Sequence, residues 1–159
     1  MLVVNKTELP SWIGKQVGVS DWLQLTQERI DRFAELTLDK QFIHLDPQRA
    51  RQAGFEGTVA HGLLTLAMIP YFAANGGVLA IADTAVRLNY GLNKVRFLHP
   101  VISGKRIRAR FTLLGFEEKR PGQLVLRHEV TIDIEGENKP ALIAETLGMN
   151  ILHPTATKP

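Results

Sequence analysis

Asp39 and His44 are the residues whose types and spacing are best suited to chemistry. A carboxylate and an imidazole that converge on one water form a general acid/base pair, because imidazole titrates near neutral pH and the carboxylate is ionised there. The two residues lie five positions apart in the sequence. That spacing separates side chains by about 140° on a helix and puts them on opposite faces of a strand, so they meet only if residues 40–43 form an irregular bend. The alternative is that Asp39 caps a turn and His44 is a satisfied buried polar residue, and spacing alone favours this alternative.

A second candidate is His61-Gly62, which opens an apolar stretch. Glycine lets a ligand approach the backbone closely, and the first N–H groups of a helix have no partner within it. Because the helix dipole makes this end partly positive, Gly62 is suited to stabilising a substrate oxygen that gains negative charge. We expect His61 to form a hydrogen bond at the helix start. A metal site built from His44, Asp46 and His61 lacks any known ligand spacing, so we expect no metal.

Three helices are expected to position these residues. Thr26 as an N-cap predicts a helix that runs to about Leu36, and Asp46-Pro47 predicts the start of a second, short helix. Residues 60–69 are apolar on nearly every side, which predicts a buried core helix. Pro70 should kink or stop that helix, because proline lacks an N–H and clashes with the preceding turn.

The second half of the chain is rich in β-branched and aromatic residues. Its four long segments are predicted strands: 86–98, 105–117, 124–134 and 142–151. Turn residues at 121–122 and 135–138 join consecutive segments, which predicts an antiparallel meander, and shorter edge strands are expected at 17–19 and 22–23. A long helix on a curved antiparallel sheet is an α+β arrangement, here predicted as one domain over 1–152 with a loose tail at 153–159.

Composition narrows the function classes. The 159 residues include no cysteine, which excludes disulfides, thiolate metal sites and a cysteine nucleophile. The net charge of +3 is compatible with an anionic ligand and weak as a sign of nucleic-acid binding. The first residues turn polar too soon for a signal peptide, and no apolar stretch reaches the roughly 20 residues that span a bilayer. We therefore expect a cytoplasmic protein without nucleic-acid or membrane partners.

Two basic rows alternate with apolar residues in the predicted strands. Lys94 and Arg96 form one row, and Arg106, Arg108 and Arg110 form the other. Either row could contact anionic phosphates, but rows of this kind are more often a solvated surface.

The segments 39–47 and 60–64, at this separation, resemble the two-part signature of the MaoC-like hydratases, which include the (R)-specific enoyl-CoA hydratases. The similarity continues through 89–97, Pro100-Val101 and Gly104, where it is closest to the nodulation-protein-N-like branch. It covers residues 10–152. Some family positions differ, including Gln41-Phe42 where many members have Asn-Pro, but no catalytic group is missing. Spacing alone favoured a structural role for Asp39 and His44, whereas the resemblance favours a catalytic role for both.

The resemblance implies a hotdog fold, in which a long helix is wrapped by a curved antiparallel sheet and two chains form a dimer. Asp39 and His44 would hold a catalytic water, and the Gly62 N–H would bind the thioester oxygen. Water would add reversibly to a trans-2-enoyl-CoA, or to its acyl-carrier-protein equivalent, to give the (R)-3-hydroxyacyl thioester without a cofactor. Substrate-binding residues are then expected at His61, Asn89, Tyr90, Gly91, Lys94 and Arg96. The alternatives are an acyl-CoA thioesterase and a non-catalytic acyl-thioester-binding subunit.

Overall fold

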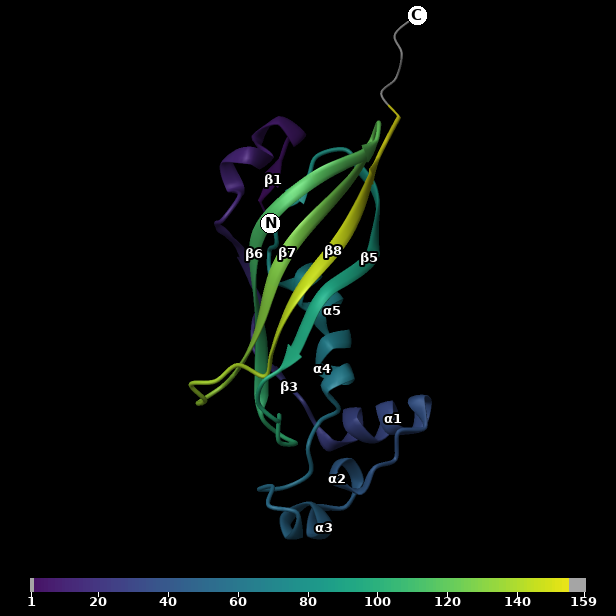
Figure 1. Cartoon of the computed structure of the whole chain (residues 1–159), viewed down its shortest axis with the longest axis vertical. Helices are drawn as coiled ribbons and strands as arrows, with labels where there is room; N and C mark the ends of the chain where they lie inside the picture. The colour runs from purple at the N-terminus through teal and green to yellow at the C-terminus, as the bar shows by residue number, and fades with distance from the viewer. Residues whose placement is uncertain (1, 155–159) are drawn as a thin grey trace, which may run out of the picture.

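A curved antiparallel sheet dominates the structure, a computed structural model that describes residues 2–154 (Figure 1). Its long strands are β5 (Thr84–Phe97), β6 (Arg106–Arg120), β7 (Gln123–Ile134) and β8 (Leu142–Leu152). The strand order is β2-β6-β7-β8-β5. The predicted meander is confirmed for β6 to β8, whereas β5 pairs with β8 rather than with its sequence neighbour β6. The reason is that the β5–β6 connection crosses from one edge of the meander to the other.

The short strands lie at the edges of the fold. Strands β2 (Gln16–Val19) and β3 (Leu23–Gln24) correspond to the two predicted edge segments, and both pair with β6, a partner that the sequence did not indicate. A small parallel pair, β1 (Val3–Val4) with β4 (Ala80–Ile81), was not predicted, since two residues carry no periodic signal. One 3₁₀ segment, η1 (Lys6–Trp12), follows β1.

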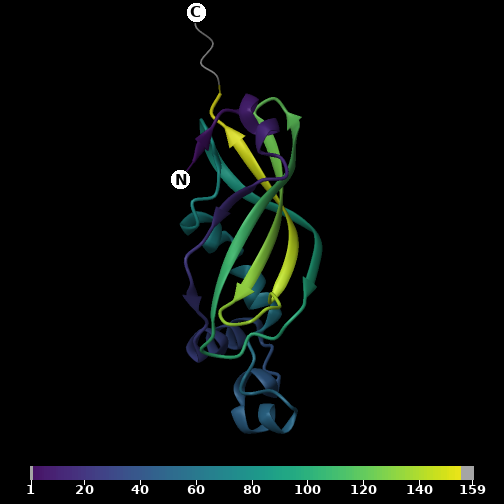
Figure 2. The same cartoon turned by 90° about the vertical axis from the view of Figure 1, so that its left-hand side faces the viewer.

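The helices that frame the site begin where the capping residues predict. Helix α1 (Gln27–Thr37) starts after Thr26, whose hydroxyl accepts a hydrogen bond from the backbone N–H of Arg29. Helix α3 (Pro47–Gln52) starts after Asp46, whose carboxylate accepts two backbone N–H groups at 3.0 Å each. Asp46 is therefore occupied as an N-cap. Both helices lie at one end of the sheet (Figures 1 and 2).

The central helix differs from its prediction in two ways. It is divided into α4 (Gly62–Ala67) and α5 (Ile69–Asn75), with the break at Met68 rather than at Pro70. Pro70 lies in the first turn of α5, where a missing N–H leaves no hydrogen bond unmade. The predicted all-round burial of residues 60–69 is also wrong, because Leu63 is 61% exposed. The sheet of one chain covers only one side of this helix pair.

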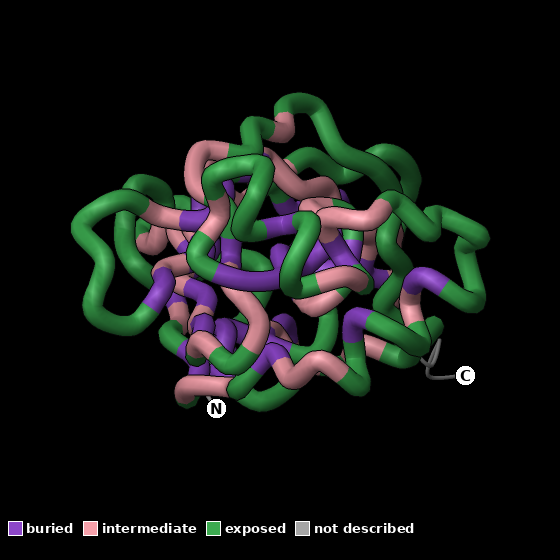
Figure 3. Tube along the Cα trace, turned by 90° about the horizontal axis from the view of Figure 1, so that it is seen from below, coloured by how far each residue is buried: buried purple, intermediate pink, exposed green. Residues whose placement is uncertain are grey.

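The core lies between the helices and the concave face of the sheet, where buried segments collect when the molecule is seen from its helical end (Figure 3). Alternate β6 residues from Ile107 to Leu113 face this core, as does Phe72 of α5. No helix among the described residues is long and apolar enough to cross a membrane. Of the predicted tail, His153 donates its backbone N–H to Asp83, and residues 155–159 lie outside the described part of the chain.

Candidate active site

The segment between α1 and α3 turns back on itself and brings three polar side chains together. Leu38 adopts a left-handed conformation with φ of 62° and ends α1. The predicted bend follows, but its second half is a helical turn, α2 (Phe42–Leu45), that carries His44. One ligand atom each from Asp39, His44 and His61 lies within 4.8 Å of the other two. Sequence spacing alone had not required Asp39 and His44 to meet, and the bend is what allows it.

His44 is buried and held in one tautomer. Its Nδ1 lies 2.6 Å from the carbonyl oxygen of Val59, which can only accept a hydrogen bond. Nδ1 therefore carries the proton, and Nε2 keeps a free lone pair. Burial is the main cause that lowers the pKa of His44 below the usual 6.5, with the neighbouring His61 acting in the same direction. The neutral imidazole with a basic Nε2 is thus the favoured form near pH 7.

His61 lies behind this dyad and is only 2% exposed. Its Nε2 donates to the backbone carbonyl of Asp39 at 2.9 Å. Its ring stacks on His44 with centroids 3.6 Å apart and packs against Phe33 on the other side at 5.0 Å. Nδ1 of His61 is buried and has no hydrogen-bond partner among the described residues. This burial leaves His61 little surface for contact with a substrate. Its expected role as a substrate-binding residue stays a prediction. The contacts that His61 makes in the structure are those of a residue that positions Asp39 and His44.

The cluster of Asp39, His44 and His61 has the composition of a metal site, but its ring geometry does not suit one. Imidazole lone pairs lie in the ring plane, and zinc–nitrogen bonds are about 2.0–2.1 Å long. The two rings are nearly parallel, at 23°, and are stacked face to face. A cation bound to both nitrogens would have to lie between the rings and far out of both planes. The geometry therefore favours a water site over a metal site.

Gly62 is the first residue of α4, so its N–H lies outside the hydrogen-bond ladder of the helix. A side-chain carbon at this position would meet the ring of Phe97 at 2.8 Å. Glycine is thus what lets the end of β5 close over the start of α4. This contact brings the edge strand of the sheet to the same place as the dyad.

The other predicted binding residues lie along β5 and are exposed. Lys94 and Arg96 are within three residues of Phe97, whereas Asn89, Tyr90 and Gly91 are at least six residues away, about 20 Å along an extended strand. Within one chain, the structure does not bring this second group to the dyad.

The second basic row is occupied by ion pairs. Arg106 pairs with Glu135 at 2.9 Å, and Arg110 and Arg108 pair with Asp133 at 2.9 and 3.3 Å. The Arg108 guanidinium also lies 4.5 Å from the ring centroid of Trp22. The three guanidinium groups thus already have partners on the surface of the sheet. This makes the row a poorer candidate for binding phosphate.

Several residues that build the site carried no signal in the sequence. Gln27 donates from its amide to the backbone carbonyl of His44 at 2.8 Å, and so ties α1 to α2. Val59 acts through its carbonyl oxygen, and Phe33 acts by packing on His61. A backbone acceptor or a packing contact can come from almost any residue type, and only the folded chain identifies it.

Comparison with known proteins identifies the family of the chain. The family described as "MaoC like domain" matches residues 8–134. Nodulation protein N of Rhizobium leguminosarum bv. viciae is 45% identical over 143 residues, covering 89% of this chain and 88% of that protein. The 3-hydroxyacyl-thioester dehydratase Z of Mycobacterium tuberculosis is 41% identical over 140 residues, covering 88% and 91%.

The fold is shared with solved structures. The (R)-hydratase from A. caviae involved in PHA biosynthesis superposes with a TM-score of 0.68 at 20% identity, covering 86% of this chain and 94% of the other. The predicted hotdog fold is therefore confirmed. The chain belongs to the MaoC-like hydratase and dehydratase family, whose members are hydro-lyases.

Proposed function

We propose that this protein is an (R)-specific enoyl-thioester hydratase that adds water reversibly to a trans-2-enoyl-CoA. The observation that carries this proposal is the convergence of the Asp39 carboxylate and the His44 imidazole within 4.8 Å. The relative from M. tuberculosis is named as a 3-hydroxyacyl-thioester dehydratase, which is the reverse direction of the same reaction.

The tautomer of His44 suggests how a water is held. Because Nε2 has a free lone pair, it accepts a hydrogen bond from the water, while the carboxylate of Asp39 accepts the other. The oxygen lone pairs of the water then face C3 of the substrate. As the C3–O bond forms, Asp39 takes one proton from the water, and the enoyl thioester becomes an enolate. The proton taken up by the Asp39–His44 pair is then returned to C2, while the other proton of the water stays on the new hydroxyl group. The product is the 3-hydroxyacyl thioester, and all atoms of the water are accounted for.

The enolate places negative charge on the thioester oxygen. The Gly62 N–H at the start of α4 is the donor we assign to that oxygen, since it is unused by the helix and lies next to His61 in the sequence. Such a donor acts mainly in the transition state, where the charge is greatest.

We also propose a homodimer that continues the sheet through β5. Among residues 2–154 this strand has a ladder partner only on its β8 side, and its exposed apolar residues include Val86, Leu88, Tyr90 and Leu92. A long apolar edge strand left open would invite aggregation, and pairing with a second copy would cover it. The exposed side of α4 and α5, at Leu63 and Tyr71, would be covered in the same assembly.

The charged end of the substrate is assigned first to Lys94 and Arg96. Both are exposed on β5, the strand whose last residue, Phe97, packs against Gly62. Contacts of this kind bind substrate and transition state alike, so Lys94→Ala and Arg96→Ala should raise KM and leave kcat nearly unchanged.

One experiment separates the proposed activity from its alternatives. Purified protein is incubated with crotonyl-CoA, and the products are separated and their stereochemistry is determined. The (R)-3-hydroxybutyryl thioester supports a hydratase, and free CoA would indicate a thioesterase. An unchanged substrate would indicate a binding subunit.

A further inference from the structure

The side-chain amide of Gln27 joins three segments of the chain. Its nitrogen donates to the backbone carbonyl of His44 in α2 and to the carboxylate of Asp31, one turn further along α1, at 2.8 Å each. Both of these oxygens can only accept, so the amide nitrogen faces them. The amide oxygen accepts a hydrogen bond from the hydroxyl of Thr58. These hydrogen bonds form a bridge, here called the Gln27 bridge, from α1 to α2 and to the segment that leads into α4.

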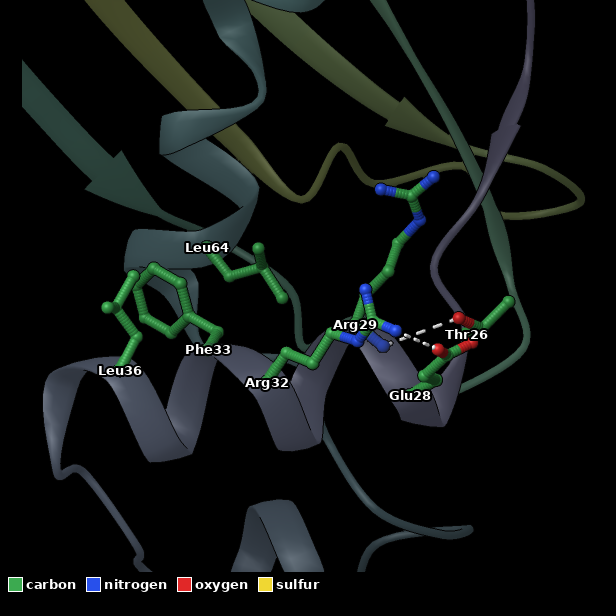
Figure 4. Close-up of a pocket in the computed structure, with 7 residues that line it drawn as sticks. All are labelled: Thr26, Glu28, Arg29, Arg32, Phe33, Leu36 and Leu64. Carbon is green, nitrogen blue, oxygen red and sulfur yellow. Dashed lines mark hydrogen bonds and ion pairs between the residues drawn. The ribbon is translucent and has the colours of Figure 1, made fainter.

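The Gln27 bridge serves contacts inside the protein. Thr26 and Glu28, the neighbours of Gln27 in the chain, line a pocket of about 460 Å³ on α1 (Figure 4), whereas the Gln27 amide is bonded to α2 and to Thr58. Thr58 is only 6% exposed. A buried hydroxyl needs a hydrogen-bond partner, and Gln27 supplies it. The bridge is therefore a built part of the interior beside the dyad.

The bridge spans the two parts of the active site. Helix α2 carries His44 of the dyad, and the segment 58–62 ends at Gly62, whose N–H is assigned to the thioester oxygen. Two further bonds join the same segments: the Val59 N–H donates to the carbonyl of Ile43 at 2.9 Å, and the Val59 carbonyl accepts from His44 Nδ1 at 2.6 Å. The Gln27 bridge adds the support of α1 to this pair of segments.

We propose that the Gln27 bridge sets the position of the dyad water relative to the Gly62 N–H. Gln27 and Thr58 are then positioning residues for hydration and do not touch the reacting atoms. The inference rests on the proposed function, in which water attacks C3 while charge develops on the thioester oxygen. Both groups must be in place at the same moment, and the substrate spans the distance between them. A shift of α2 weakens contacts that matter most in the transition state, so it lowers kcat more than it raises KM.

Three substitutions break the bridge at different bonds. Gln27→Met keeps the length and helix propensity of the side chain and removes the whole amide. Gln27→Glu keeps the acceptor for Thr58 and loses the donor to His44, whereas Thr58→Val keeps the shape and loses the hydroxyl. Thr58→Ser is the conservative variant, because it keeps a hydroxyl. Ser20→Ala is the matched control, since Ser20 is also 6% exposed and its hydroxyl accepts from the N–H of Ala109 in the sheet.

Each of the three substitutions should lower kcat for crotonyl-CoA by a factor of about 10–10² with little change in KM, because small misplacements of catalytic groups are costly. Thr58→Ser should stay close to the wild-type rate, and Ser20→Ala should lower stability in urea without lowering kcat. The double variant Gln27→Met/Thr58→Val should be no slower than the slower single variant, since both changes remove the same bridge.

Amide hydrogen exchange supplies a readout that needs no substrate. The Val59 N–H crosses between the bridged segments, so its exchange, relative to the amides of β7, should be faster in the three bridge variants and unchanged in Ser20→Ala. The proposal is overturned by wild-type kcat in the folded variants, by a rise in KM alone, by additive losses in the double variant, or by an equal loss of kcat in the control. An inactive wild-type protein would instead contradict the proposed function, and unchanged exchange at Val59 would then still overturn the role of the bridge.

Discussion

The imidazole rings of His44 and His61 are stacked, with centroids 3.6 Å apart and planes inclined by 23°. Each ring is fixed by a different carbonyl: His44 donates to Val59, and His61 donates to Asp39. The stack therefore links the side chain of one dyad member to the backbone of the other. His61 is placed to position both Asp39 and His44 without touching the reacting atoms.

Variants of His61 can separate its hydrogen bond from its stacking. His61→Gln keeps an N–H donor near the position of Nε2 and loses the ring, whereas His61→Phe keeps the ring and loses the donor. His61→Ala loses both, and we expect it to lower kcat by about 10² with little change in KM, because small misplacements of catalytic groups are costly. Gln and Phe should each recover part of this loss. A folded Ala variant with wild-type kcat would remove the positioning role.

The dyad itself is tested by Asp39→Asn and His44→Gln. The first keeps the shape of the side chain and removes the base, and the second keeps a polar group that cannot titrate. If the pair acts by general acid/base catalysis, each substitution should lower kcat by about 10²–10⁴. Steady-state hydration of crotonyl-CoA measures this, with circular dichroism as the control for folding. Near-normal rates in either folded variant would refute the assignment.

The burial of His44 predicts where activity is lost in acid. The proposed water site requires a neutral His44, and burial lowers its pKa below the ordinary 6.5. As pH falls through 6.5, kcat/KM should therefore stay level and decline only at lower pH. A pH profile of kcat/KM for crotonyl-CoA checks this, and His44→Gln should show no decline from this group. A midpoint at or above pH 6.5 would show that His44 is not the buried neutral base described here.

Assembly through β5 is tested by placing a charge on its open edge. Leu88→Lys should prevent pairing, since charged side chains on an edge strand oppose its addition to another. Ile13→Lys is the matched control, because Ile13 and Leu88 are both 47% exposed but only Leu88 lies on β5. Sedimentation velocity at micromolar concentration should give a dimer for the wild type and the control and a monomer for Leu88→Lys. A fully active wild-type monomer would contradict the proposed dimer.

Local signals in the sequence predicted where helices begin, but they predicted the packing of those helices less well. Thr26 and Asp46 mark the starts of α1 and α3, because a capping side chain satisfies N–H groups within its own turn. The burial of α4 was overestimated because Leu63 is apolar, yet the described part of the chain leaves 61% of this residue exposed. An apolar residue type indicates that a side chain is suited to burial. It does not indicate whether the same chain or another molecule buries it.

The site shows the same division. Asp39 and His44 were identifiable by type and by family resemblance, but their meeting depends on the left-handed backbone at Leu38, a residue with no intrinsic preference for it. Arg108 and Arg110 were correctly placed on one strand face, whereas their shared partner Asp133 lies on the next strand. Partners of this kind, far apart in the sequence, depend on the register in which β6 and β7 pair, and local sequence patterns do not determine that register.

His128 has no role in the proposed reaction and predicts a pH-dependent stability. It lies on β7 between Leu113 of β6 and Thr146 of β8, and its Nε2 is buried without a hydrogen-bond partner among the described residues. Burial lowers its pKa from 6.5 to about 4. Above pH 6.5 the imidazole is neutral in both the folded and the unfolded chain. Between pH 6.5 and about 4 the unfolded chain binds a proton that the folded chain does not, so the free energy of unfolding falls as pH falls.

From pH 7 to pH 5 this linkage amounts to a loss of about 2 kcal/mol. His128→Leu removes the titrating group and leaves an apolar side chain opposite Leu113. We therefore expect the free energy of unfolding to fall by about 2 kcal/mol more in the wild type than in the variant over this interval. Urea unfolding at the two pH values measures the difference, and the carboxylates, which are common to both proteins, cancel from the comparison. An equal loss in both proteins would mean that His128 is already protonated, or is partnered by water, in the folded state.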